Sequence, residues 1–230
     1  MEIKFLPIEK NFLYSHLLFI VLCIIVLIVP FPLLIGMKLF ILVLVYNFLI
    51  LLVGVVRNHS NWLKLYYFVL FISFFQIFPD WYLSAQLDIL VFPEDGFLKI
   101  GTVSAYMLGL WVIPLFIICF VSLRIKERYS IKSAYLSAIL LSFIIFSFAE
   151  QSMWVFSWYP QNVILIFDHL AVYIIIPEII LGFSSFYLFL KFMDNKIYFK
   201  IAIAFVVMLL YLGAANFFYF LIEKILIFNL

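Results

Sequence analysis

The sequence predicts an all-α, polytopic membrane protein with about seven transmembrane helices. Only 11% of its 230 residues are charged and 69% are hydrophobic, whereas soluble domains carry about 25% charged residues. The mean hydropathy is +1.28. Because one span needs about 20 apolar residues, this length leaves little room for a soluble domain. We therefore expect a single transmembrane helical domain over residues 1–230.

Apolar runs give the order of the predicted spans. Pro30 and Pro32 are expected to loosen the end of the first helix, and residues 36–38 form the predicted turn into the second. The longest connection, residues 84–102, is acidic and partly apolar, which favours an ordered segment at the membrane interface. The predicted spans cover residues 12–34, 39–56, 65–83, 103–123, 134–155, 169–190 and 198–222.

Lysine and arginine residues are distributed unevenly between the two predicted sides of the membrane. Of the 14 in the chain, all except Lys38, Lys99 and Lys224 fall before the first span or in alternate connections. Basic residues near spans favour the cytosolic side. The pattern predicts a multi-pass protein of the cell membrane with a cytosolic N-terminus and, with seven spans, a C-terminus outside.

Signals for metals, cofactors and nucleic acids are weak. His16, His59 and His169 are widely separated and form no H-E-x-x-H pair, while Cys23 and Cys119 lie within apolar runs. The basic residues are spread over several loops, which favours anionic lipid headgroups as neighbours and no nucleic acid. We expect no cofactor and no metal, with membrane lipids as partners; the oligomeric state stays open.

The stretch V-Y-I-I-I-P-E-I-I-L-G places Pro177 and Glu178 inside the sixth predicted span. If that helix begins near Asp168, Glu178 lies roughly 15 Å deep, close to the middle of the bilayer. A charge there costs at least about 2.5–3.5 kcal/mol. Two interpretations remain: a structural glutamate that hydrogen-bonds a neighbouring helix, or an acid kept neutral by desolvation and able to donate a proton.

Other polar and aromatic residues fall near the outer ends of predicted spans. Asp168 also fits a helix N-cap, and an unbroken helix would place His169 about 180° away from Glu178. Aromatic faces can stabilise a carbocation, so an acid beside them in a dry pocket fits isomerisation or cyclisation of an alkene. The candidate catalytic residues are Glu178, Asp80, Glu150 and Asp168, and the candidate substrate-binding residues are Trp81, Trp154, Trp158, Tyr173 and His169.

Two pairs of short motifs fit a degenerate repeat over about residues 65–123 and 134–190. P-D-W-Y is followed by I-G-T-V-S-A-Y-M-L-G-L-W-V-I-P, and W-Y-P-Q-N is followed by D-H-L-A-V-Y-I-I-I-P-E. The arrangement resembles the W-D and P-x-E-E type motifs of the membrane-embedded lycopene cyclases in their fused, two-repeat form. The chain has no Glu-Glu pair, and Pro114 is followed by leucine. The resemblance implies a role in carotenoid or other isoprenoid biosynthesis, with Asp80 and Glu178 as proton-handling residues.

Three functional hypotheses follow. The first is an intramembrane, cofactor-free isomerase or cyclase acting on a hydrophobic prenyl or lipid substrate. The second is a non-enzymatic carrier or partner subunit in which Glu178 is structural or handles protons. The third is a lipid hydrolase that uses Glu150, Asp168 and His169.

Overall fold

The computed structural model describes residues 5–226, and within them seven helical spans are long and apolar enough to cross a membrane. The predicted fold class, an all-α polytopic membrane protein, is confirmed. The expected single domain also includes residues 1–4 and 227–230, which lie outside the described residues. The long helices are α1 (Pro7–Ile28), α2 (Ile35–Val56), α3 (Ser60–Trp81), α5 (Val112–Arg128), α6 (Ile131–Met153), α7 (Ile175–Phe192) and α8 (Ile197–Tyr219), and the short helix α4 (Met107–Leu110) precedes α5.

The predicted boundary between the first two spans is wrong. Helix α1 ends at Ile28, and residues 29–34 form the connection, because Pro30 and Pro32 have no N–H with which to continue a helix. Residues 36–38 belong to the first turn of α2. There Gly36 donates its N–H to the carbonyl of Asp95 at 2.9 Å, and a Cβ at this position would come within 2.5 Å of the Asp95 carboxylate.

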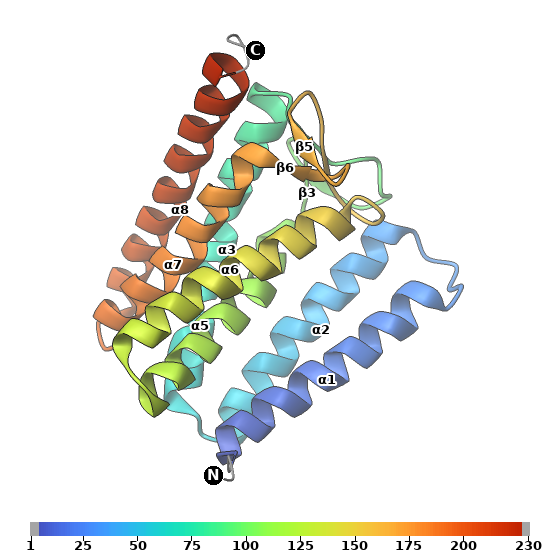
Figure 1. Cartoon of the computed structure of the whole chain (residues 1–230). Helices are drawn as coiled ribbons and strands as arrows, with labels where there is room; N and C mark the ends of the chain where they lie inside the picture. Colours follow the sequence, from blue (N-terminus) through green and yellow to red (C-terminus); the bar gives the residue numbers. More distant parts are fainter. Residues whose placement is uncertain (1–4, 227–230) are drawn as a thin grey trace.

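The helices form a bundle in which α3 is central and α1 lies at one edge (Figure 1). Helix α3 packs against α5, α7 and α8, and its side chains Leu65, Val69 and Ile72 are fully buried. Helices α6 and α7 approach closely where Gly182 faces Ser142, since a Cβ on Gly182 would lie 1.9 Å from the serine oxygen. Most of the α1 surface is exposed and apolar, as expected for a lipid-facing helix.

Two long connections fold together at the end of the bundle opposite the N-terminus (Figure 1). Strand β1 (Leu90–Val91) pairs with β4 (Tyr159–Pro160), which joins the two connections. Two further antiparallel pairs form hairpins within them: β2 (Lys99–Ile100) with β3 (Val103–Ser104), and β5 (Leu165–Ile166) with β6 (Leu170–Ala171). We call this the capped end of the bundle.

The other end has short turns and carries most of the basic residues; we call it the N-side end. Ion pairs connect distant parts of the chain there. Glu9 at the start of α1 pairs with Arg128 at the end of α5, and Lys64 in α3 pairs with Asp194 at 2.6 Å. These contacts bring the starts of α1 and α3 to the same end as the α7–α8 connection.

Candidate functional site

Three buried carboxyl groups meet below the capped end. Asp80 lies in the last turn of α3, Glu150 in the last turn of α6, and Glu178 in the first turn of α7. Their exposed fractions are only 2%, 7% and 2%. Both Glu150 and Asp80 lie within electrostatic range of Glu178. The antiparallel course of the helices brings together these acids, which are far apart in sequence.

For Glu178, the predicted start of the helix is wrong. Its helix does not begin at Asp168: a 3-10 helix, Val172–Ile174, leads into α7, and Pro177 is the third residue of that helix. A proline is tolerated in the first turn because its missing N–H has no intrahelical acceptor there. Glu178 is therefore in the first turn of α7, at the capped end, and not halfway along the helix. Its Oε2 atom has no hydrogen-bond partner among the described residues.

The other two carboxyl groups each accept a hydrogen bond from an indole. Trp111 donates its Nε1–H to Asp80 at 3.0 Å, and Trp158 donates its Nε1–H to Glu150 at 2.8 Å. Both indoles are buried. Because an indole N–H can only donate, each bond fixes one carboxyl oxygen as an acceptor. Glu178 differs from both since it has no such donor.

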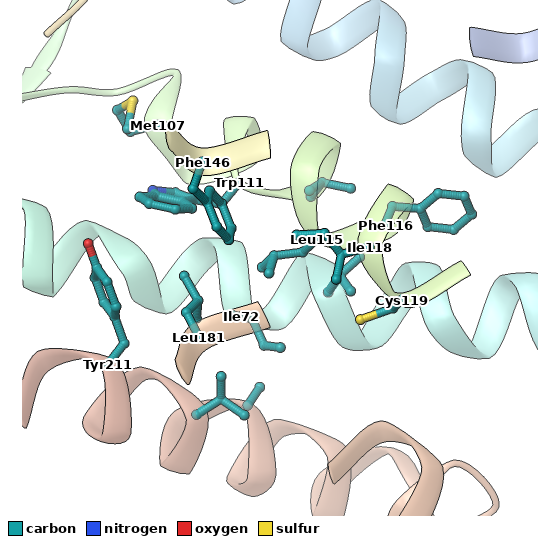
Figure 2. Close-up of a cluster of buried hydrophobic side chains, with 14 of the residues drawn as sticks. Ile72, Met107, Trp111, Leu115, Phe116, Ile118, Cys119, Phe146, Leu181 and Tyr211 are labelled. Atoms are coloured by element: carbon teal, nitrogen blue, oxygen red, sulfur yellow. The ribbon is translucent and has the colours of Figure 1, made fainter. Parts of the chain in front are cut away.

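Aromatic rings surround these acids. Figure 2 shows Trp111 beside Phe146, with Tyr211 reaching toward them from α8. The ring centroid of Trp111 lies 5.7 Å from that of Phe146 and 5.9 Å from that of Tyr211. Tyr173, which was predicted from the sequence, is also buried at this level. Asp80 and Glu150 therefore lie among aromatic side chains, away from solvent.

An apolar cavity of about 420 Å³ leads to this cluster; we call it the lipid-facing cavity. Phe19 of α1, Leu42 of α2 and Phe148 of α6 contribute to its walls, and it ends at Glu150 and Glu178. Phe148 is 73% exposed on the membrane-facing surface, so the cavity opens toward lipid. This volume lies within the usual range for small-molecule sites, about 300–1,000 Å³.

A much smaller cavity of about 20 Å³ lies behind the first. Asp80, Tyr173 and Tyr211 line it, while Glu150 lines both cavities. The small cavity has room for about one water molecule. Glu150 thus connects the lipid-facing cavity to the inner pair of Asp80 and Tyr211.

Several predicted site residues lie elsewhere. Asp168 is exposed in the β5–β6 turn with φ of 71°, so the predicted helix N-cap is wrong; aspartate tolerates this left-handed conformation better than most residues. His169 stacks on Trp154 with ring centroids 4.3 Å apart, away from both cavities. Trp81 is 40% exposed and packs against Gly101. The structure brings Asp80, Glu150, Glu178, Trp158 and Tyr173 together and leaves Asp168, His169, Trp154 and Trp81 apart.

Two residues of the cluster were not selected from the sequence: Trp111 and Tyr211. Each has a polar tip within an otherwise apolar helical segment. Such tips usually find a hydrogen-bond partner when they are buried, and this signal could have identified them. Within residues 5–226, no group of three His, Cys, Asp or Glu side chains has a metal-binding arrangement.

Comparison with known proteins gives one match. No curated protein and no solved structure matches the chain. A family model described as a domain of unknown function, DUF6989, matches residues 77–222. This range is more than half of the chain and contains Asp80, Glu150 and Glu178. The chain therefore belongs to the DUF6989 family.

Proposed function

We propose that the protein is an intramembrane, cofactor-free isomerase or cyclase acting on an apolar prenyl or lipid substrate that contains a carbon–carbon double bond. The observation that carries this proposal is the lipid-facing cavity, which opens toward the membrane and ends at Glu150 and Glu178. An apolar chain can enter from the bilayer without crossing water. Its double bond can then reach an acid in a water-poor setting.

The proposed reaction begins with proton transfer from a neutral carboxyl to one alkene carbon, which leaves a carbocation on the adjacent carbon. Loss of a proton from a neighbouring carbon to a carboxylate then gives a shifted double bond. Alternatively, a second double bond of the substrate attacks the cation and closes a ring before the proton leaves. One proton enters and one departs, so no net oxidation occurs.

Glu178 is the proposed proton donor. Its Oε2 atom has no hydrogen-bond partner among the described residues, and Glu178 lines the lipid-facing cavity. Repulsion between neighbouring carboxylates in a medium of low dielectric constant disfavours simultaneous ionisation of all three acids, so Glu178 can keep its proton while Glu150 is ionised. After each reaction, the proton that Glu150 has accepted returns to Glu178. A shared proton can therefore remain within the cluster.

Glu150 is the proposed acceptor of the returning proton, and Asp80 a positioning residue that acts through Trp111. Glu150 lines both cavities. The Trp111 indole donates a hydrogen bond to Asp80, and Trp111 also lines the lipid-facing cavity. The rings of Trp111 and Phe146, which line the lipid-facing cavity, supply cation–π stabilisation, worth about 2 kcal/mol or more when desolvated. The resemblance to lycopene cyclases supports the same chemistry, although membership of that family stays a prediction.

The decisive experiment compares lipid extracts from cells that express wild type or Glu178→Gln. Isomerisation and cyclisation leave the mass unchanged, so the product is a species of unchanged mass with altered chromatographic retention. We expect it only with wild type. Glu223→Gln is the matched control, because Glu223 is also a buried carboxyl near the capped end but lines neither cavity. Identical extracts from folded wild type and Glu178→Gln would contradict the proposal and favour a non-enzymatic carrier or partner subunit.

The proposed orientation in the cell membrane has the N-side end in the cytosol and the capped end outside. Ion pairing between the starts of α1 and α3 and two other N-side connections supports grouping these basic segments on one side. Tyr129→Cys and Phe167→Cys place thiols at exposed positions on opposite ends. A membrane-impermeant maleimide added to intact cells should label only Phe167→Cys; labelling of only Tyr129→Cys would reverse the orientation.

A further inference from the structure

A third cavity, of about 360 Å³, lies at the N-side end, far from the three acids; we call it the N-side cavity. Its polar wall consists of the α2–α3 turn, the start of α3 and the end of α5. Its apolar wall includes Trp62, Phe120 and Leu123. Ser60 and Asn61 are exposed, so the cavity opens at this end of the bundle. The polar lining residues are Asn58, His59, Ser60, Asn61, Arg124 and Glu127.

The start of α3 supplies hydrogen-bond donors to the cavity. Its N-cap residue, His59, makes no side-chain hydrogen bond to the helix. The first N–H groups of a helix have no intrahelical acceptor and carry the positive end of the helix dipole. Ser60, Asn61 and Trp62, the first three residues of this long helix, all line the cavity. This geometry is typical of anion sites at helix N-termini.

Arg124 supplies a cation from the opposite wall. Its side chain is 13% exposed, and its buried Nε atom has no hydrogen-bond partner among residues 5–226. Its Nη2 atom pairs with Glu127 one turn along α5. Glu127 is 40% exposed, whereas Arg124 is mostly buried, so the carboxylate is the partner that water can solvate. Glu127 can therefore turn toward water and leave the planar guanidinium to bind an anion through two bonds.

His59 adds a third donor. The amide of Asn11 donates to its Nε2 atom at 2.9 Å, so the neutral ring carries its proton on Nδ1. Partial burial and then the positive charge of Arg57 lower the pKa of His59 below its usual value. The second cause indicates a positive potential at the α2–α3 turn. The carboxylate of Glu127 is the one negative group among the described lining residues.

We propose that the N-side cavity binds a phosphate group, supplied either by an anionic lipid headgroup in the adjacent leaflet or by free phosphate. Phosphate oxygens match the α3 N–H groups, the Arg124 guanidinium and the His59 ring. The apolar wall of Trp62, Phe120 and Leu123 can accommodate the first carbons of a lipid tail. This proposal uses none of the residues of the acid cluster and does not depend on the proposed reaction.

The test measures lipid binding to the full chain in detergent by native mass spectrometry. Dioleoyl phosphatidic acid is compared with dioleoyl phosphatidylcholine, which carries a compensating positive charge. Wild type should prefer phosphatidic acid, and Arg124→Gln should weaken that binding about tenfold or more, as expected for loss of a charged hydrogen bond. Lys126→Gln is the matched control, because Lys126 is exposed on the same helix end and does not line the cavity.

A second variant, Asn61→Asp, tests the same site with a substitution that is expected to leave the protein folded. A carboxylate in the first turn of α3 interacts favourably with the helix dipole, but it repels a bound phosphate. We expect a fold at least as stable as wild type and weaker binding of phosphatidic acid. Equal binding by wild type, Arg124→Gln and Asn61→Asp, or equal losses in Arg124→Gln and Lys126→Gln, would overturn the proposal.

Inorganic phosphate distinguishes the two sources. Its effect on the thermal unfolding midpoint is measured without added lipid and compared with that of sodium chloride at equal ionic strength. A stabilisation by phosphate that Arg124→Gln abolishes assigns the site to the free anion. If only phosphatidic acid binds in an Arg124-dependent manner, the site is assigned to a lipid headgroup.

Discussion

The two ends of the bundle manage charge in opposite ways. At the capped end, Asp80, Glu150 and Glu178 are buried below two long, interlocked connections, and only two of the three acids receive an indole N–H. At the N-side end, two acids each have a cationic partner on another segment: buried Glu9 pairs with Arg128, and exposed Asp194 pairs with Lys64. Burying ionisable groups is costly unless they are paired or neutral. The capped end therefore carries an energetic cost that pairing with cations reduces at the N-side end.

The largest expected effect comes from filling the lipid-facing cavity. Ala149→Trp places an indole between α6 and α2, where Ala149 lines this cavity. If apolar substrate reaches the acids by this route, product formation should fall about 100-fold or more, as misplacement of a reacting group can cause. The measurement is the same-mass product in lipid extracts.

The matched control is Ala202→Trp, at an exposed position of α8 that lines neither the lipid-facing cavity nor the small one. It adds the same side chain to the lipid-facing surface and should leave product formation unchanged. Retained activity in a folded Ala149→Trp protein would refute entry through the lipid-facing cavity.

Removal of an indole donor should have the next largest effect. Trp111→Phe keeps most of the ring but leaves the buried Asp80 carboxyl without the indole N–H that donates to it. An unsatisfied buried polar group costs about 1–3 kcal/mol. The unfolding midpoint in detergent should fall accordingly. Trp81→Phe, at a position 40% exposed, is expected to change stability by less than about 0.5 kcal/mol; equal losses in both variants would remove the special role of the indole.

A smaller loss is expected at the N-side end for Glu9→Gln. Glu9 pairs with Arg128 and accepts the backbone N–H of Leu6 at 2.8 Å. The amide oxygen of glutamine can keep the backbone bond, so only the charge pairing is removed. Glu9 is buried, but Arg128 is 30% exposed and can be solvated when the negative charge is lost, so the cost should be about 1 kcal/mol. Increasing salt should reduce the difference between wild type and variant in chemical unfolding. If Glu9→Gln lowered the free energy of unfolding more than Trp111→Phe does, the predicted order of the two ends would be wrong.

The smallest effect concerns Asp194, whose pKa is lowered first by the hydrogen bond from Lys64 and then by its charge. A lowered pKa in the folded state gives stability that is present above the ordinary aspartate value and disappears as the pH falls through the folded value. In Lys64→Gln the pKa of Asp194 should return to its usual range. NMR titration of the labelled carboxyl measures this change, and an unchanged low pKa would require another partner.

The sequence predicted the number of spans better than the residues at which the helices begin, as two cases show. Glu9 and Lys10 were placed before the first span, yet α1 begins at Pro7, because proline fits the first helical position and the Glu9 carboxylate accepts the free N–H of Leu6. Residues 169–171 were assigned to the sixth span because they lead directly into an apolar run. In the structure they complete the β5–β6 hairpin, and α7 starts only at Ile175. Hydropathy measures the solvent that a segment prefers, not its hydrogen-bond partner.

The sequence by itself determined that this chain crosses a membrane about seven times, since so few charged residues cannot make a water-soluble surface. It also placed Glu178 inside a span, where a carboxylate is costly, and named Asp80 and Glu150 as candidate acids near span ends. Only the tertiary structure decided that these three meet, that Asp168 and His169 stay outside, and that Trp111 and Tyr211 join them. Hydropathy acts on each segment separately, whereas a site depends on helix rotation and on side-chain contacts between segments distant in the chain.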